Sequence, residues 1–267
     1  MKKSVIILAY FSITILIASG CSSSKEMSVP ASLYKSAEGM EIAWNSYDSV
    51  LTLFENEFTE DFVDTDYGRS HLLVSGENDA HPVILVPGLF GDATMWYNNM
   101  GELSKHFRVY CLDMPNYGGK NQPYGKAIKD IDDYRIWISH IMDHYDLKNV
   151  SLVGISYSSW LALALTREMP ETFASIVLLD PSETFMPMNG GIAWKGFKSF
   201  MFFPNRNKYA GFLDWLGGGY TDEEFKASAQ GSLPHAEVVI VPGCGHGLNM
   251  ENPGYVNARI IDFLNNN

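Results

Sequence analysis

The chain has 267 residues, which is enough for one α/β domain and too many for a small disulfide-stapled protein. Its 46% hydrophobic content can fill a core, and only 19% of its residues are charged, which argues against wholesale disorder. The formal net charge of −12 repels phosphate backbones and gives no attraction to anionic lipid. Nucleic acid is therefore not expected as a partner. Three cysteines cannot form a disulfide framework.

The N-terminus has the features of a secretory signal. Lys2 and Lys3 precede an apolar run over residues 5–18 that is shorter than a membrane span, and small residues follow it. This pattern predicts a signal peptide over residues 1–20 and therefore export. The end of the segment, Ala18-Ser19-Gly20-Cys21, resembles a bacterial lipobox, except that Ala18 stands where Leu is usual.

The lipobox resemblance implies that the sulfur of Cys21 is acylated and that the signal is cut just before it. The protein is then lipid-anchored to a bacterial cell membrane on its extracytoplasmic side, with residues 21–30 as a polar tether. Two alternatives stay open. Ala18 and Gly20 also suit ordinary signal peptidase, and the segment could remain as an uncleaved anchor.

After the tether, short apolar runs alternate with segments of helical periodicity. Residues 28–68 at first show helical spacing of their apolar side chains. Later apolar runs predict strands over 71–74, 82–86, 107–113, 150–153, 175–179 and 237–241. Helical spacing predicts helices over 131–145, 160–167 and 254–264. This order is typical of an α/β domain, here spanning residues 31–267, with a mostly parallel sheet covered on both faces.

Residues 182–235 break this alternation. They concentrate aromatic and methionine side chains between clusters of glycine and contain no clear strand. We interpret them as an apolar helical insertion. It either forms a small core of its own or acts as a lid over a pocket for an apolar substrate group, and the two interpretations are compatible.

A candidate nucleophile lies between the strand at 150–153 and the helix that follows. The segment Gly154-Ile155-Ser156-Tyr157-Ser158 places Ser156 on a tight strand-to-helix turn, with its hydroxyl raised above the edge of the sheet. The helix N-terminus behind it favours developing negative charge. The alternative is that Ser156 only caps the helix.

Two further segments follow strands that should end at the same edge of the sheet. A turn after residue 86 can aim the backbone N–H of Leu89 into the crevice that the N–H of Tyr157 faces, which gives two donors to an oxyanion. His246 follows the predicted strand at 237–241. The carboxyl ends of strands are where an open α/β sheet places its functional side chains. The alternative for His246 is a surface loop residue without a role.

The other histidines, Cys111, Cys244 and Asp113 are not expected to take part in catalysis. Six other histidines lack the setting of His246 and are expected at the surface: His71, His81, His106, His140, His144 and His235. Cys111 is expected in a buried strand and Cys244 exposed in the histidine loop, without a bridge between them. Asp113 is expected to brace a loop.

These motifs resemble the α/β-hydrolase superfamily from about residue 66 to the C-terminus. The shared features are the Ser156 turn, the loop over 86–91, the segment 112–118 and Gly245-His246. Further segments look like the bacillar carboxylesterases that include the naproxen esterase: 67–71, 94–97, 181–185 and 220–224. The resemblance implies attack by Ser156 on an ester carbonyl, His246 as general base and then acid, and an acid that orients His246. It implies no metal and no organic cofactor.

The sequence departs from the family at three places. Pro87 replaces the usual His before Gly88, and Ser158 replaces Gly in the nucleophile motif. The third departure is a missing strand that normally ends in the catalytic acid about 25–30 residues before the His. The chain runs from 221–225 to the predicted last strand without an apolar run or a Gly-Asp step.

A catalytic acid, if the chain has one, therefore comes from another position. Asp222, Glu223 and Glu224 are better explained as favourable acids at a helix N-terminus. Asp180 ends the strand after the nucleophile helix, and some lipases of the superfamily carry their acid there. The alternatives are that Asp180 only closes the strand with a turn, or that no acid is present.

Two functions follow. The first is a serine hydrolase, a carboxylesterase that acts on small-molecule esters with apolar acyl groups. The second is a degenerate member that binds an apolar ligand or partner without turnover. The retention of Ser156 and His246 favours the enzyme, and the lost strand favours the binder.

Overall fold

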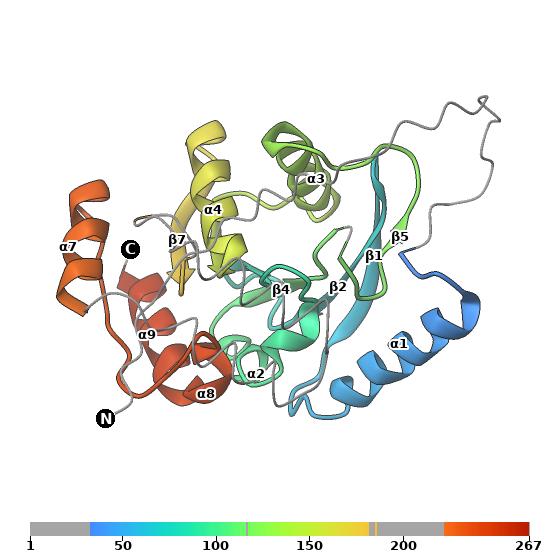
Figure 1. The fold of residues 1–267 in the computed structure, drawn as a ribbon, viewed down its shortest axis with the longest axis horizontal. Coiled ribbons are helices and arrows are strands. Elements are labelled where there is room, and N and C mark those ends of the chain that lie inside the picture. The colour runs from blue at the N-terminus through green and yellow to red at the C-terminus, as the bar shows by residue number, and fades with distance from the viewer. Residues whose placement is uncertain (1–32, 116, 182–184, 186–221, 267) are drawn as a thin grey trace, which may run out of the picture.

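The computed structural model describes residues 33–115, 117–181, 185 and 222–266. A seven-stranded sheet runs through the centre of this part of the chain (Figure 1). Its strands are β1 (Thr59–Thr65), β2 (Gly68–Ser75), β3 (Pro82–Val86), β4 (Arg108–Leu112), β5 (Gln122–Pro123), β6 (Val150–Ile155) and β7 (Phe173–Leu179). The order is β1-β2-β4-β3-β6-β7, with β5 paired to β2.

The sheet is mixed but mostly parallel where the predicted site lies. β3 pairs in parallel with β4 and β6, and β6 pairs in parallel with β7, while β2 is antiparallel to its neighbours. Ile84 of β3 lies opposite Tyr110 of β4 and Leu152 of β6, which places β3 at the centre. The parallel strands therefore end at one common edge.

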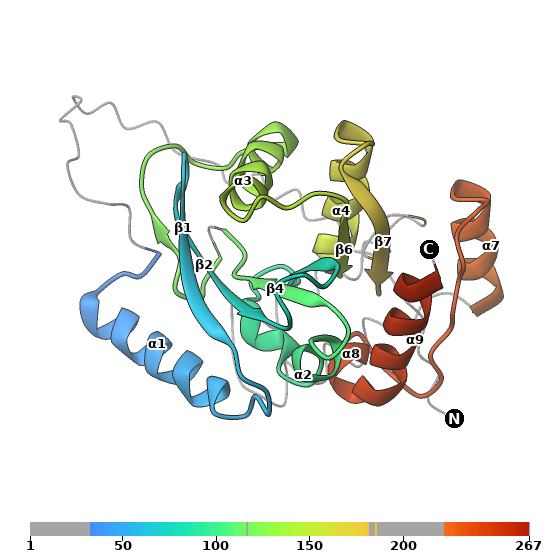
Figure 2. The same cartoon turned by 180° about the vertical axis from the view of Figure 1, so that it is seen from behind.

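Helices cover both faces of the sheet (Figures 1 and 2). On one face of the sheet lie α3 (Ile131–His144) and α4 (Tyr157–Glu168). The other packs α1 (Ala37–Leu51), η1 (Ala93–Trp96), α2 (Met100–Leu103), α8 (Leu248–Glu251) and α9 (Pro253–Asn266). Successive residues of β3 alternate between the two cores, because side chains along a strand point to opposite faces. The predicted α/β class is confirmed.

The helices form where apolar spacing and capping agree. Along α3, Tyr134, Trp137, Ile138 and Ile141 recur at three, four and seven residues and are buried. The carboxylate of Asp130 accepts a hydrogen bond from the backbone N–H at the third residue of α3 over 3.1 Å, which satisfies an otherwise unpaired donor of the first turn. The helix predicted over 131–145 is thus confirmed almost to the residue.

Two predicted elements are wrong. Residues 59–65, included in the helical N-terminal region, form β1, which pairs with β2 through a two-residue connection. β1 is an edge strand in which only Val63 and Thr65 are buried, so its apolar pattern is weak. Residues 237–241 form no strand, because they do not pair with β7, the last strand of the described sheet. Val241 still packs against the core beside α9.

Part of the predicted organisation lies outside the described residues. This holds for the signal peptide over 1–20, for the tether over 21–30 with Cys21, and for most of the lid at 182–235. Of the lid, the structure describes Phe185 and the region that begins with α7 (Asp222–Ser232). Phe225 of α7 is buried and stacks edge-on against Phe185 at 5.9 Å. Among the described helices, none is both long and apolar enough to span a membrane.

Candidate active site

Ser156 occupies a strained turn between β6 and α4. Its backbone has φ 56° and ψ −122°, a conformation that L-residues seldom adopt and that occurs at nucleophile turns of this kind. Gly154 permits the turn, because a Cβ there would lie 2.2 Å from the carbonyl oxygen of Ser158. The Ser156 hydroxyl makes no capping hydrogen bond to α4. Helix capping therefore does not explain this serine.

His246 reaches Ser156 from the loop before α8. Its Nε2 lies 2.9 Å from the Oγ of Ser156. The loop is fixed from behind, because the carboxylate of Glu251 accepts the backbone N–H of Gly245 over 2.8 Å. The His246 side chain is 15% exposed, so solvent reaches only part of the ring. The geometry suits proton transfer between the hydroxyl and the imidazole.

Asp180 completes the constellation from the end of β7. The register pairs Ile155 with Leu179, so Ser156 and Asp180 are the next residues on two neighbouring parallel strands. Asp180 is 1% exposed and its carboxylate forms an ion pair with Nδ1 of His246, the ring nitrogen opposite the one that faces Ser156. Asp180 also has a positive φ of 44°. The structure thus brings together all three residues predicted for catalysis.

The electrostatics favour a charged imidazole at this position. Burial lowers the pKa of His246, but the charge and hydrogen bond of Asp180, together with the charge of Glu251, outweigh burial and raise it above its usual value. A histidine that accepts the proton of a serine becomes an imidazolium. The carboxylates around His246 stabilise that charged form.

The segment that carries Leu89 packs directly against the nucleophile. A Cβ on Gly88 would lie 3.5 Å from the Cβ of Ser156. The turn closes through a 2.9 Å hydrogen bond from the N–H of Gly91 to the carbonyl of Gly88, with Phe90 at φ 62°. We call residues 88–93 the oxyanion turn, after the oxyanion donor that the sequence predicts at Leu89. Leu89 lies in this turn and Tyr157 begins α4, so their predicted N–H donors flank Ser156 on two different elements.

One residue predicted at the surface is part of the core. His71 is fully buried in β2, and its Nδ1 lies 2.8 Å from the Oδ2 of Asp113. Asp113 is also fully buried and accepts the N–H of Ala93 over 2.8 Å, so it braces the oxyanion turn as predicted for a loop-bracing residue. The apolar run around His71 was the available signal, since a residue inside such a run faces a core.

Cys244 is also placed differently from the prediction. It is 4% exposed, and burial together with the charge of Glu251 raises the pKa of its thiol. A raised pKa leaves little thiolate, which disfavours oxidation at this position. Cys111 is buried in β4 as expected, and both thiols are free. Within the described part of the chain, no three His, Cys, Asp or Glu side chains form a group that could hold a metal ion.

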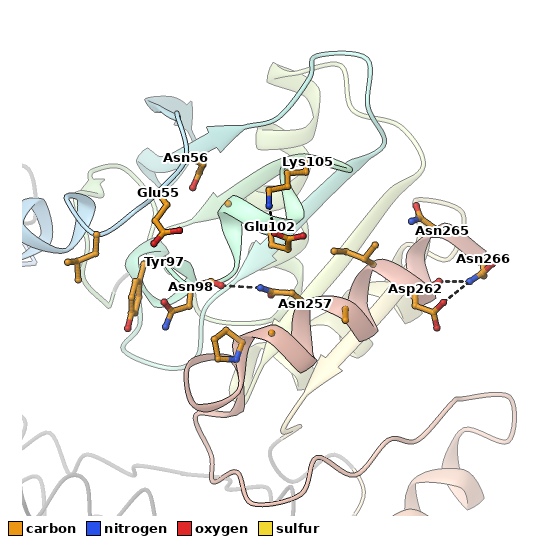
Figure 3. Close-up of a pocket in the computed structure, with 16 residues that line it drawn as sticks. Glu55, Asn56, Tyr97, Asn98, Glu102, Lys105, Asn257, Asp262, Asn265 and Asn266 are labelled. Atoms are coloured by element: carbon orange, nitrogen blue, oxygen red, sulfur yellow. Dashed lines mark hydrogen bonds and ion pairs between the residues drawn. The ribbon is translucent and has the colours of Figure 1, made fainter.

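A separate groove of about 1020 Å³ lies between α2 and α9, on the side of the sheet that faces α1 (Figure 3). Carboxamide and carboxylate side chains dominate its wall, among them Asn98, Glu102, Asn257 and Asp262. Of the described residues that line it, none belongs to the Ser156 constellation. The groove is therefore distinct from the candidate active site.

Comparison with known proteins gives one family and a consistent set of relatives. A family model for the alpha/beta hydrolase fold matches residues 81–211. The uncharacterized carboxylesterase nap of Bacillus subtilis is 24% identical over 277 aligned residues, covering 83% of this chain and 92% of the relative. Carboxylesterase YbfK of the same organism is also 24% identical, over 83% of this chain and 93% of its own.

Solved structures agree on the fold. The crystal structure of naproxen esterase from Bacillus subtilis superposes with a TM-score of 0.75 at 22% identity, covering 86% of this chain and 99% of the other. Carboxylesterase CesB (YbfK) from Bacillus subtilis gives a TM-score of 0.74 at 21% identity, covering 85% and 99%. At this level of identity the likeness establishes the shared fold.

Proposed function

We propose that this chain, which belongs to the α/β-hydrolase superfamily, is a serine hydrolase that cleaves carboxylic esters with apolar acyl groups. The main support for the proposal is a chain of contacts between three side chains at one edge of the sheet. Ser156 Oγ lies 2.9 Å from one nitrogen of His246, and buried Asp180 pairs with the other nitrogen. This arrangement supports covalent catalysis by the serine.

The reaction divides into two halves. His246 accepts the proton of Ser156 while Oγ attacks the ester carbonyl, and the carbonyl oxygen becomes an oxyanion between the N–H groups of Leu89 and Tyr157. Protonated His246 then gives its proton to the leaving alcohol, which yields an acyl-Ser156. Water, deprotonated by His246, attacks the acyl carbonyl. As the bond between the acyl carbon and Oγ breaks, His246 returns the proton to Ser156 Oγ and the carboxylic acid leaves. Asp180 orients the ring and stabilises its charge throughout.

Backbone strain favours the enzyme over the ligand-binding alternative. Ser156 and Asp180 both hold positive φ values, at 56° and 44°. Each such conformation costs about 1–3 kcal/mol, and such strain concentrates at functional sites. A protein that only binds an apolar ligand has no need of either strained residue. The carboxylesterase relatives support an ester as the substrate.

Exposed apolar side chains beside Ser156 support an apolar acyl group. Leu89 is 37% exposed and Phe90 is 62% exposed, both in the oxyanion turn. Met250 is 37% exposed on α8, next to the loop of His246. Exposed apolar side chains on either side of a catalytic group offer contacts to an apolar substrate.

The test is hydrolysis of a chain-length series of p-nitrophenyl esters by the full chain in detergent. We expect turnover that depends on Ser156 and favours short to medium apolar acyl groups. A rate no higher than that of Ser156→Ala would remove the esterase function. If this loss accompanied normal folding and saturable binding of an apolar probe, the ligand-binding alternative would take its place.

The N-terminal pattern supports a second proposal, concerning location. We propose that the protein is exported and anchored to a bacterial membrane through acylated Cys21, with its hydrolase domain on the extracytoplasmic side.

A further inference from the structure

Helix α1 is connected to the oxyanion turn through one oxygen atom. Tyr47 of α1 is buried, and its hydroxyl donates a 3.0 Å hydrogen bond to the Oδ1 of Asp113. The same Oδ1 accepts the backbone N–H of Ala93 over 2.8 Å. Ala93 ends the turn that begins at Gly88, beside Ser156. A side chain from the N-terminal helix thus shares an acceptor with the turn that carries Leu89.

The second oxygen of Asp113 is held as firmly. Its Oδ2 accepts the backbone N–H of Lys120 over 2.7 Å and lies 2.8 Å from Nδ1 of His71. Nε2 of His71 in turn lies 3.1 Å from the carboxylate of Glu60. A buried carboxylate surrounded by donors on both oxygens has one preferred orientation, and removing a donor leaves it partly unsatisfied.

Helix α1 also holds the far end of the segment that begins at Asp113. The Nζ of Lys120 lies 2.5 Å from a carboxylate oxygen of Asp48 on α1 and 5.1 Å from the ring centroid of Tyr47. Just before α1, the hydroxyl of Tyr34 donates a 2.6 Å hydrogen bond to the carbonyl of Gly119. Figure 2 shows α1 running beside β1.

Close packing leaves the Asp113 carboxylate little room to move. A Cβ on Gly119 would lie 2.1 Å from its Oδ2, so the backbone of residue 119 already touches the carboxylate. Burial, followed by the charges of Asp113 and Asp92, raises the pKa of Tyr47. Tyr47 therefore stays protonated and remains a hydrogen-bond donor throughout the range in which the enzyme works.

We propose that helix α1 is a positioning element of the active site, in which Tyr47 orients Asp113 and thereby fixes the oxyanion turn against Ser156. Tyr47 is a positioning residue, since it acts through Asp113 and Ala93 and touches no reacting atom. The inference rests on the proposed hydrolase function, because the turn matters for rate only if an oxyanion forms beside it.

The test compares two Tyr→Phe variants of the full chain, each lacking one hydroxyl that donates to a carboxylate. Tyr47→Phe removes the donor to Asp113. Tyr145→Phe is the matched control, because its partly buried hydroxyl donates over 2.7 Å to Asp61 of β1, which is not in contact with the oxyanion turn. Rates are measured on p-nitrophenyl esters and divided by the active-site concentration titrated with a fluorophosphonate, so unfolded protein is not counted.

We expect Tyr47→Phe to lower kcat by about tenfold with KM within about twofold of wild type, because a displaced turn weakens stabilisation of the transition state more than binding of the substrate. Tyr145→Phe should keep the wild-type kcat. An unchanged kcat in Tyr47→Phe, equal losses in both variants, or a rise in KM alone would overturn the inference. Lack of Ser156-dependent turnover in wild type would instead overturn the proposed function.

Discussion

The hydroxyl of Ser158 donates a 2.5 Å hydrogen bond to the carbonyl oxygen of Pro87. These are two of the three positions at which the sequence departs from the superfamily pattern, and the structure joins them. Ser158 belongs to the nucleophile helix and Pro87 leads into the oxyanion turn, so the bond ties the first residues of the turn to α4. Asp113 holds the other end through Ala93.

This bond predicts the effect of removing the Ser158 hydroxyl. Ser158→Ala leaves the buried Pro87 carbonyl without its donor, which should destabilise the fold by about 1–3 kcal/mol and lower kcat severalfold. Denaturant unfolding and ester hydrolysis measure the two effects. Thr166→Ala on the same helix removes a hydroxyl bonded to the Ala162 carbonyl and should leave kcat unchanged. Equal kcat in both variants would show that the bond does not position the turn.

Asp180 should be required for turnover. Asp180→Asn preserves shape but removes the charge that pairs with His246 and favours the wrong tautomer, so kcat should fall by about 10⁴. Thermal unfolding checks that the variant is folded, and a sensitive fluorogenic ester measures its residual rate. A loss smaller than about tenfold would show that Asp180 is not the carboxylate that orients His246 during turnover.

The raised pKa of His246 predicts the acid limb of the pH profile. His246 must be neutral to accept a proton, so kcat/KM falls as the pH drops below this pKa, which lies above about 6.5. Glu251→Gln removes one charge that raises the pKa while keeping an oxygen for the N–H of Gly245. The acid limb should therefore move to lower pH with little loss on the plateau.

The control for this shift is Glu102→Gln, which removes an exposed carboxylate of α2 that pairs with Lys105. Its pH profile should match that of wild type. A Glu251→Gln profile that also matched wild type, or that moved to higher pH, would contradict the electrostatic role given to Glu251.

The lipid anchor has its own test. Wild-type protein expressed in a bacterial host should enter the detergent phase on phase partitioning. Cys21→Ser should either enter the aqueous phase or accumulate as an unprocessed precursor, because it cannot be acylated. Recovery of wild type in the aqueous phase would count against acylation of Cys21.

Regular, two-sided burial made most of the fold predictable from the sequence. The strands around Ile84 and Leu152 are buried along nearly their whole length and consist mainly of apolar residues, because helices cover both faces. The edge strand β1 lacked that signal, since water faces half of its side chains. The segment 237–241 carried a strand pattern, but pairing depends on a neighbouring strand and not on its own composition.

The candidate site likewise has one part that the sequence predicted and one part that it did not. Ser156 and Asp180 each follow a strand, and the parallel pairing of β6 and β7 indicated that they meet. His246 follows an apolar run that forms no strand, yet its loop reaches the same place. The support from Tyr47 and His71 could not be predicted, because it joins α1, β2 and the end of β4 through contacts distant in sequence. The polarity of His71 suggested a surface position, although the apolar run around it indicated a position in the core.

Covalent capture of Ser156 tests the central claim most directly. The folded wild-type chain and Ser156→Ala are incubated with a fluorophosphonate, and intact mass followed by peptide mapping locates any adduct. The structure predicts one adduct on Ser156 in wild type and none in Ser156→Ala, with both proteins unfolding at similar temperatures. A folded wild type that stays unlabelled, or that carries its adduct on another residue, would contradict the assignment of Ser156 as a nucleophile activated by His246 and Asp180.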